Sequence, residues 1–164
     1  MARLPAGAAV IYRAFGAKRA EAQGRALRKL ARTRRLIFLV GADAELAARL
    51  DADGVHLPEG LMPLAPRLRQ AHPNWLFTTA AHSPGAIAAA ARLRLDAALV
   101  STVFASESRS AGRPLGPTRF AALAREARLP VIALGGVDVA TAGRLASSGA
   151  AGLAAIGGLM DRPR

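Results

Sequence analysis

The chain has 164 residues, 52% of them hydrophobic, and carries a formal net charge of +12. This length and hydrophobicity exclude a disordered chain and indicate a single domain over residues 1–164 with a full core. The absence of cysteine excludes disulfides, thiolate metal sites and cysteine nucleophiles. No apolar stretch reaches the roughly 18 residues of a membrane span, and residues 1–7 do not form a signal peptide, so we expect a cytoplasmic protein with no membrane partner.

Much of the positive charge lies near the N-terminus. Eight basic residues lie between Lys18 and Arg35, where Glu21 is the single acid. Such a cluster is typical of nucleic-acid binding, and equally of a solvated helix face in an arginine-rich chain. The segment contains no aromatic residue on which a base could stack. Nucleic acid is therefore disfavoured as a partner.

Seven short apolar runs follow one another along the chain. Each is rich in aliphatic or β-branched residues, which is typical of strands buried on both faces. The predicted strands are Ala8–Tyr12, Leu36–Val40, Gly54–Leu57, Leu76–Ala80, Ala97–Ser101, Val131–Leu134 and Gly152–Ile156.

Helical stretches separate these runs. Asp43, Ser83 and Asp138 each stand where a side chain can cap the helix that follows. The predicted helices are Ala17–Arg34, Ala44–Leu50, Met62–Ala71, Pro84–Arg92, Pro117–Ala127 and Val139–Ser147.

The alternation of strands and helices predicts an α/β fold with a parallel sheet. An open, doubly wound sheet is the alternative to a (β/α)8 barrel. No G-x-G-x-x-G motif follows the first strand, which favours the TIM-barrel type. A closed barrel has eight strands, so we expect an incomplete one of seven strands that lacks the first. Its open strand edge would need covering, which predicts a homo-oligomer.

Glycine pairs follow the last two predicted strands. Gly135–Gly136 ends one run and Gly157–Gly158 ends the other. Glycine lets backbone N–H groups approach an anion, and (β/α)8 barrels bind phosphate at the loops after their last strands. The two pairs predict a site for a phosphorylated small molecule, with simple tight turns as the alternative.

Five motifs together point to a known family. They are Asp53–Leu57, Ala81–Ser83, Val103–Phe104, Val131–Val137 and Gly149–Ala155. In order and spacing they resemble thiamine phosphate synthases and, equally, the related TenI-like thiazole tautomerases; Pro58–Glu59 looks more like the tautomerase branch. The resemblance spans about residues 10–160 and leaves the family's first strand without a counterpart. It implies the joining of a pyrimidine methyl pyrophosphate to a thiazole phosphate, with Mg²⁺ as cofactor.

The resemblance also implies roles for individual residues. Arg109 takes the place of a catalytic cation in the loop after Val103–Phe104. His56, Glu59 and His82 are further candidates, each of which could instead have a purely structural role. The positions that correspond to substrate and phosphate contacts are Arg13, Ser106, Ser108, Gly136, Ile156 and Gly157.

The metal site departs from the family pattern. Its two carboxylate positions fall on Ala42 and Leu61, and the nearest acids are Asp43 and Glu59. The tautomerase histidine falls on Thr102, which cannot exchange a proton near neutral pH. We therefore expect a synthase-like protein with a degenerate metal site. The alternatives are a non-catalytic or regulatory binder of thiazole phosphate and, more distantly, a basic nucleic-acid-binding protein.

Overall fold

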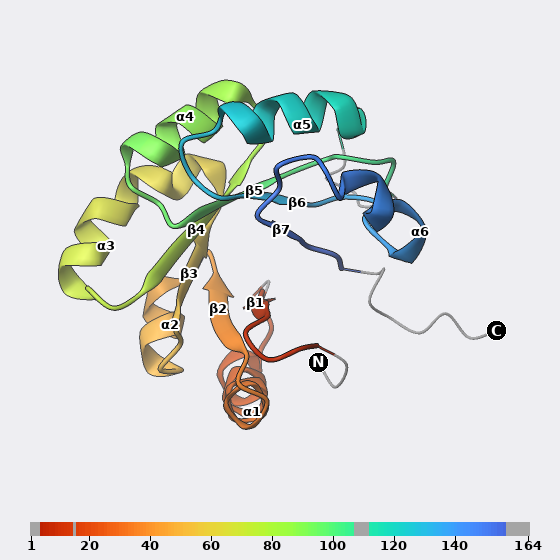
Figure 1. Cartoon of the computed structure of the whole chain (residues 1–164). Helices are drawn as coiled ribbons and strands as arrows, with labels where there is room; N and C mark the ends of the chain where they lie inside the picture. Colours follow the sequence, from red (N-terminus) through yellow and green to blue (C-terminus); the bar gives the residue numbers. More distant parts are fainter. Residues whose placement is uncertain (1–3, 15, 107–111, 157–164) are drawn as a thin grey trace. The chain divides into compact units, whose positions relative to one another are not determined.

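A computed structural model describes residues 4–14, 16–106 and 112–156 (Figure 1). Seven strands form one sheet in which the order in space follows the order in the chain. The strands are β1 (Ala9–Tyr12), β2 (Ile37–Gly41), β3 (Gly54–Leu57), β4 (Leu76–Ala81), β5 (Ala97–Val100), β6 (Val131–Ala133) and β7 (Gly152–Leu153).

Strand pairing is parallel, with Val10 opposite Phe38 in β1 and β2, and Leu99 opposite Ile132 in β5 and β6. A doubly wound sheet would reverse its strand order at a switch point, and this sheet does not. The predicted α/β fold of the TIM-barrel type, with seven parallel strands alternating with helices, is confirmed.

Helices lie between successive strands, close to the predicted positions. They are α1 (Ala20–Thr33), α2 (Ala44–Arg49), α3 (Ala65–Ala71), α4 (Pro84–Arg92), α5 (Gly116–Glu126) and α6 (Val139–Ala142), with 3-10 helices η1 (Glu59–Leu64) and η2 (Gly143–Leu145). The predicted helix at Met62–Ala71 starts earlier, as η1, and becomes α-helical only after Pro63, which lacks the N–H that an α-helix requires. The stretch after Asp138 likewise changes from α6 to η2 at Gly143.

All three predicted caps are present. Asp43 accepts a hydrogen bond from the Leu46 N–H at 2.8 Å, and Ser83 accepts one from Ala86 at 3.1 Å. Asp138 forms a capping box with Thr141. Each side chain satisfies a backbone donor that the first helical turn leaves free, which fixes where the helix begins after its strand.

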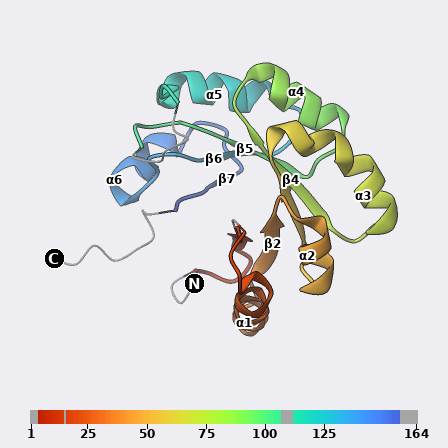
Figure 2. The same ribbon diagram turned by 180° about the vertical axis from the view of Figure 1, so that it is seen from behind.

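The chain forms two compact units, residues 1–78 and 79–164. The prediction of a single domain stays a prediction. In the first unit, α1 and α2 pack against β2 (Figures 1 and 2). Three consecutive residues of β2, Phe38, Leu39 and Val40, are buried, as expected for a strand covered on both faces. In the second unit, all four residues of β5 are buried.

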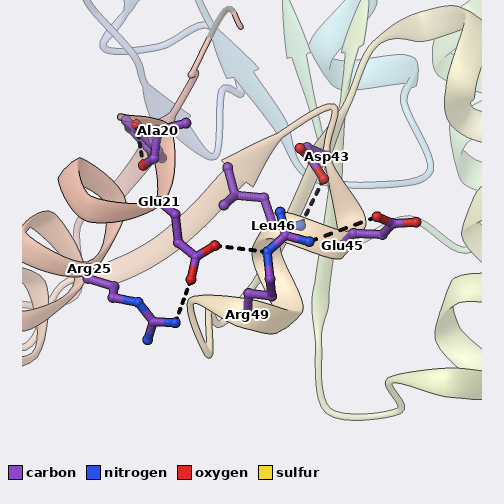
Figure 3. A network of polar contacts seen from close by, with 8 residues as sticks. Ala20, Glu21, Arg25, Asp43, Glu45, Leu46 and Arg49 are labelled. Carbon is purple, nitrogen blue, oxygen red and sulfur yellow. Dashed lines mark hydrogen bonds and ion pairs between the residues drawn. The ribbon is translucent and has the colours of Figure 1, made fainter. Parts of the chain in front are cut away.

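An ion-pair network joins α1 to α2 (Figure 3). Glu21 accepts hydrogen bonds from Arg25 at 2.6 Å and from Arg49 at 3.2 Å. The bond from Arg25, with the charge of both arginines, lowers the pKa of Glu21. The groups are exposed, so the network contributes little stability. It does neutralise part of the cationic surface of α1.

The two outermost strands differ from the interior ones in exposure. In β7, Leu153 is 47% exposed, and Ile156, beyond the strand, is 73% exposed. The strand is also shorter than predicted, since it ends at Leu153. The homo-oligomer expected from an open edge stays a prediction. Throughout the described ranges, no helix is both long and apolar enough to cross a membrane.

Replacing Gly54 should test the contact between the start of β3 and β4. A Cβ at Gly54 would lie 2.0 Å from the Leu76 carbonyl oxygen, a contact that the backbone must move to relieve. We expect Gly54→Ala to lower the free energy of unfolding by about 3 kcal/mol in chemical denaturation. Gly60→Ala is the matched control, because a Cβ there meets nothing within 4 Å. Equal stability of the two variants would contradict this packing.

Candidate functional site

The carboxyl ends of β1, β2 and β3 meet in the first unit. Gly41 ends β2 and lies opposite His56 in β3. A Cβ at Gly41 would lie 2.8 Å from Arg13 Cγ, so the side chain of Arg13, which follows β1, lies against the end of β2. A larger residue at position 41 would displace it. The lack of a side chain at Gly41 thus positions an exposed cation at this edge of the sheet.

The surroundings of His56 lower its pKa strongly. Its Nδ1 lies 3.0 Å from Thr78 Oγ1 in β4. Burial, and secondarily the charge of Arg13, lower the pKa of His56 from 6.5 to about 4. Near neutral pH the imidazole is therefore uncharged and acts as a hydrogen-bonding group. Arg13 is a cation at this edge that can attract a phosphate.

The two acidic metal candidates lie at the starts of helices. Asp43 uses its Oδ1 to cap α2, as Figure 3 shows. Glu59 begins η1, behind Pro58. Over the residues that the structure describes, no group of three or more His, Cys, Asp or Glu side chains could hold a metal ion. Mg²⁺ is usually held by one or two carboxylates together with waters and substrate phosphates. The degenerate metal site, with Asp43 and Glu59 as its candidates, stays a prediction.

In the second unit, the segment after β5 is held from two sides. Val103 and Phe104 donate backbone hydrogen bonds to Leu134 and Gly135, each at 3.0 Å. Thr102 accepts from Leu115, and Val103 accepts from Gly116, each at 2.9 Å. Both ends of the loop that carries the candidate residues are therefore fixed next to the end of β6. Ser106 is the last described residue before residues 107–111.

The glycine pair after β6 has a packing role. With φ at +62°, Gly136 lies against the loop after β5, and a Cβ there would be 2.3 Å from the Ala105 carbonyl oxygen. This contact gives the tight-turn alternative a physical basis. It also places the Gly136 backbone beside Ala105 and hence near the start of the candidate substrate loop. A phosphate-binding role for Gly136 stays a prediction.

His82 lies at the start of the loop after β4. Its Nδ1 is 3.1 Å from the Ser101 carbonyl oxygen and 3.3 Å from the Ser101 hydroxyl oxygen. The imidazole thus lies at the carboxyl end of β5, next to the buried Thr102. Sequence reasoning missed both Ser101 and Thr78 as partners of the histidines. The sequence contained one indication of these contacts: Ser101 and Thr78 each lie in a predicted strand that is next to the strand of their histidine.

Three candidates lie outside the described residues. Ser108 and Arg109 belong to residues 107–111, and Gly157 begins the segment 157–164. Ile156, the neighbour of Gly157, is described and exposed. The structure therefore brings together Arg13 with His56 in the first unit, and the Ser106 segment with Gly136 in the second.

Comparisons with known proteins identify the family. The family model described as "Thiamine monophosphate synthase" matches residues 2–159. A thiamine-phosphate synthase of Chlorobium luteolum is 34% identical in an alignment of length 147 that covers 85% of this chain and 69% of the relative. A putative thiamine-phosphate synthase of Geobacter sulfurreducens is 33% identical, over 85% of this chain and 66% of the relative. The chain thus spans about two thirds of the length of these curated relatives.

Solved structures show the same fold. A thiamine phosphate pyrophosphorylase from Pyrococcus furiosus is 25% identical, with a TM-score of 0.78 over 90% of this chain and 71% of its own. A 3-hexulose-6-phosphate synthase has a TM-score of 0.67 at 18% identity, covering 90% of this chain and 77% of its own. The second likeness concerns the fold alone.

The pKa of His56 predicts how stability changes with pH. The unfolded chain binds a proton near pH 6.5 and the folded chain only near pH 4, so protonation favours the unfolded state. We expect the free energy of unfolding to fall as the pH decreases from about 6.5 to 4, by about 3 kcal/mol at most from this group. Urea denaturation at several pH values measures it.

In His56→Asn the free energy of unfolding should decrease less between about pH 6.5 and 4 than in the unchanged protein. His72→Asn, which changes a histidine away from these strand ends, is the matched control and should leave the decrease in place. A decrease of the same size in His56→Asn would show that other groups cause it.

Proposed function

Because the chain belongs to the thiamine monophosphate synthase family, we propose that it is a thiamine phosphate synthase-like protein of thiamine biosynthesis. Its substrates would be a pyrimidine methyl pyrophosphate and a thiazole phosphate, which the reaction joins. The match over residues 2–159 supports the assignment. The observation that carries it is the packing of the Ser101–Ser106 segment against Gly135 and Gly136, at the strand ends where the family pattern places the thiazole phosphate.

The second unit would bind the thiazole phosphate. Neighbouring parallel strands end at the same edge of a sheet, so the loops after β5 and β6 can supply groups to one anion. Ser106 and Ser108 would contribute hydroxyl donors, and Arg109 a planar, permanently charged donor suited to phosphate.

In the first unit, Arg13 would supply the positive charge for the pyrophosphate. Neutral His56, held near Thr78, would offer a hydrogen bond without adding charge. Where Mg²⁺ binds in such a reaction, it neutralises charge on the departing pyrophosphate. Ala42 and Leu61 carry no side-chain oxygen, and Asp43 caps α2, so the chain's own cations would have to take over this stabilisation.

The loss of the two metal carboxylates also favours a second candidate function. A protein that keeps the phosphate-binding loops but lacks the metal carboxylates could bind thiazole phosphate without turning it over. Its role would then be storage or regulation. The two candidates share the binding step and differ in catalysis, so separate experiments address each.

Binding should depend on the cation in the substrate loop. We expect thiazole phosphate to bind in isothermal titration calorimetry, and Arg109→Gln to weaken it roughly tenfold or more, as loss of a hydrogen bond to a charged group predicts. Arg128→Gln makes the same change after α5 of the same unit and should leave the affinity unaltered. Equal weakening by both variants, or no binding of thiazole phosphate at millimolar concentration, would refute the assigned site.

Turnover should be absent or much slower than in relatives with both metal carboxylates. Removal of one group that stabilises charge in the transition state typically lowers the rate by a factor on the order of 10²–10³. Here Ala42 and Leu61 replace two such groups. A coupled assay for thiamine phosphate, with and without Mg²⁺, measures this. Asp43→Asn is the decisive variant, because asparagine keeps the cap on α2 and removes only the charge. Robust Mg²⁺-dependent turnover that Asp43→Asn abolishes would show a working metal site.

A further inference from the structure

Arg144 is an exposed cation that the second unit holds over an aromatic ring. It lies in η2, directly after α6, and belongs to none of the five motifs that indicate the family. Its guanidinium carbon is 5.1 Å from the centroid of the Phe104 ring, which is within the range of a cation–π interaction. Phe104 itself is buried, so the ring offers the guanidinium a fixed surface.

Phe104 brings Arg144 close to the glycine pair after β6. The Phe104 N–H donates to the Gly135 carbonyl oxygen at 3.0 Å. A Cβ at Gly136 would lie 2.8 Å from the Cβ of Phe104, so the lack of a side chain at Gly136 lets the two segments touch. The ring that carries the guanidinium therefore belongs to the residue that joins the segment after β5 to the end of β6.

A second contact ties the helical stretch of Arg144 to the same turn. The Thr141 hydroxyl lies at hydrogen-bond distance, 2.9 Å, from the Gly136 carbonyl oxygen. Thr141 and Arg144 are three residues apart, a spacing that places two side chains on the same face of a helical turn. Arg144 is thus on the face of α6 and η2 that meets Gly136. Figures 1 and 2 show α6 beside the segment after β5.

The hydrogen-bond donors of Arg144 are available to a ligand. A cation–π contact uses the face of the ring and occupies none of the five N–H donors of a guanidinium. Among the residues that the structure describes, Arg144 has no hydrogen bond or ion pair. Asp138, the acid nearest to it in the chain, accepts from the N–H groups of Ala140 and Thr141 and so caps α6. The guanidinium is held in place without being neutralised.

We propose that Arg144 is a substrate-binding residue that donates to the phosphate group of the thiazole phosphate, with Phe104 as its positioning residue. This assignment rests on the proposed function and adds a cation to the site that the Ser106 segment and Gly136 form. A phosphate monoester carries close to two negative charges near neutral pH, so it can bind a second cation besides Arg109. Arginine suits this role because its planar fork matches phosphate oxygens.

Calorimetric titration with thiazole phosphate and with its unphosphorylated alcohol tests the role of the charge. Arg144→Gln should weaken thiazole phosphate binding roughly tenfold and leave the affinity for the alcohol unchanged, because only the phosphate meets the guanidinium. A purely structural role would change both affinities or neither. Arg144→Lys, which keeps the charge, should weaken binding less than Arg144→Gln does. Arg128→Gln, which changes another exposed arginine of the same unit, is the matched control and should bind both ligands normally.

Phe104→Leu separates positioning from charge. It removes the ring and keeps an apolar side chain, so thiazole phosphate should bind about threefold more weakly. In the Arg144→Gln background the same change should have little further effect, because the cation that the ring positions is already gone.

The outcomes distinguish this assignment from the proposed function. If the unchanged protein binds thiazole phosphate and Arg144→Gln binds it equally well, or if Arg128→Gln weakens binding as much, Arg144 is not a substrate-binding residue. If the unchanged protein does not bind thiazole phosphate at millimolar concentration, the proposed function fails together with it. The Arg144 variants change an exposed side chain, so they decide the question even if Phe104→Leu does not fold.

Discussion

The parallel pairing of consecutive strands is the constraint on which the rest of the structure depends. Within each unit, neighbouring strands run in the same direction, so every loop that follows a strand emerges at one edge. Arg13 and His56 meet in the first unit for this reason, and the segment after β5 meets Gly135–Gly136 in the second. The intervening helices return the chain to the opposite edge, where a different set of residues collects.

Asp53 organises that opposite edge in the first unit. Its carboxylate accepts from the Phe38 N–H at 2.7 Å and from Arg28, so one side chain joins β2, α1 and the start of β3. A half-buried carboxylate is stable there because a guanidinium and a backbone N–H donate hydrogen bonds to it. The same arrangement fixes the position of the Arg28 guanidinium. A residue within the Asp53–Leu57 motif thus has a structural role distinct from the chemistry that the motif suggests.

Several candidate residues have structural roles that leave less freedom for chemistry. Asp43 caps a helix, Gly136 makes room for a carbonyl, and His56 is buried beside Thr78. Packing accounts for each of these residue types at these positions. The proposal of a phosphorylated substrate rests on Arg13, Ser106, Ser108 and Arg109, together with family membership.

The sequence alone determined the strands, the alternation with helices and the three caps, because apolar periodicity and capping depend on residues close together in the chain. Motif order was enough to indicate the family. Only the tertiary structure decided that Thr78 lies beside His56, that Ser101 lies beside His82 and that Ala105 requires glycine at position 136, since each contact joins residues distant in the chain. The place of Arg144 over the ring of Phe104 needed the packing of α6 and η2 against the segment after β5. Contacts of this kind depend on where strands and helices lie in space, which no local pattern encodes.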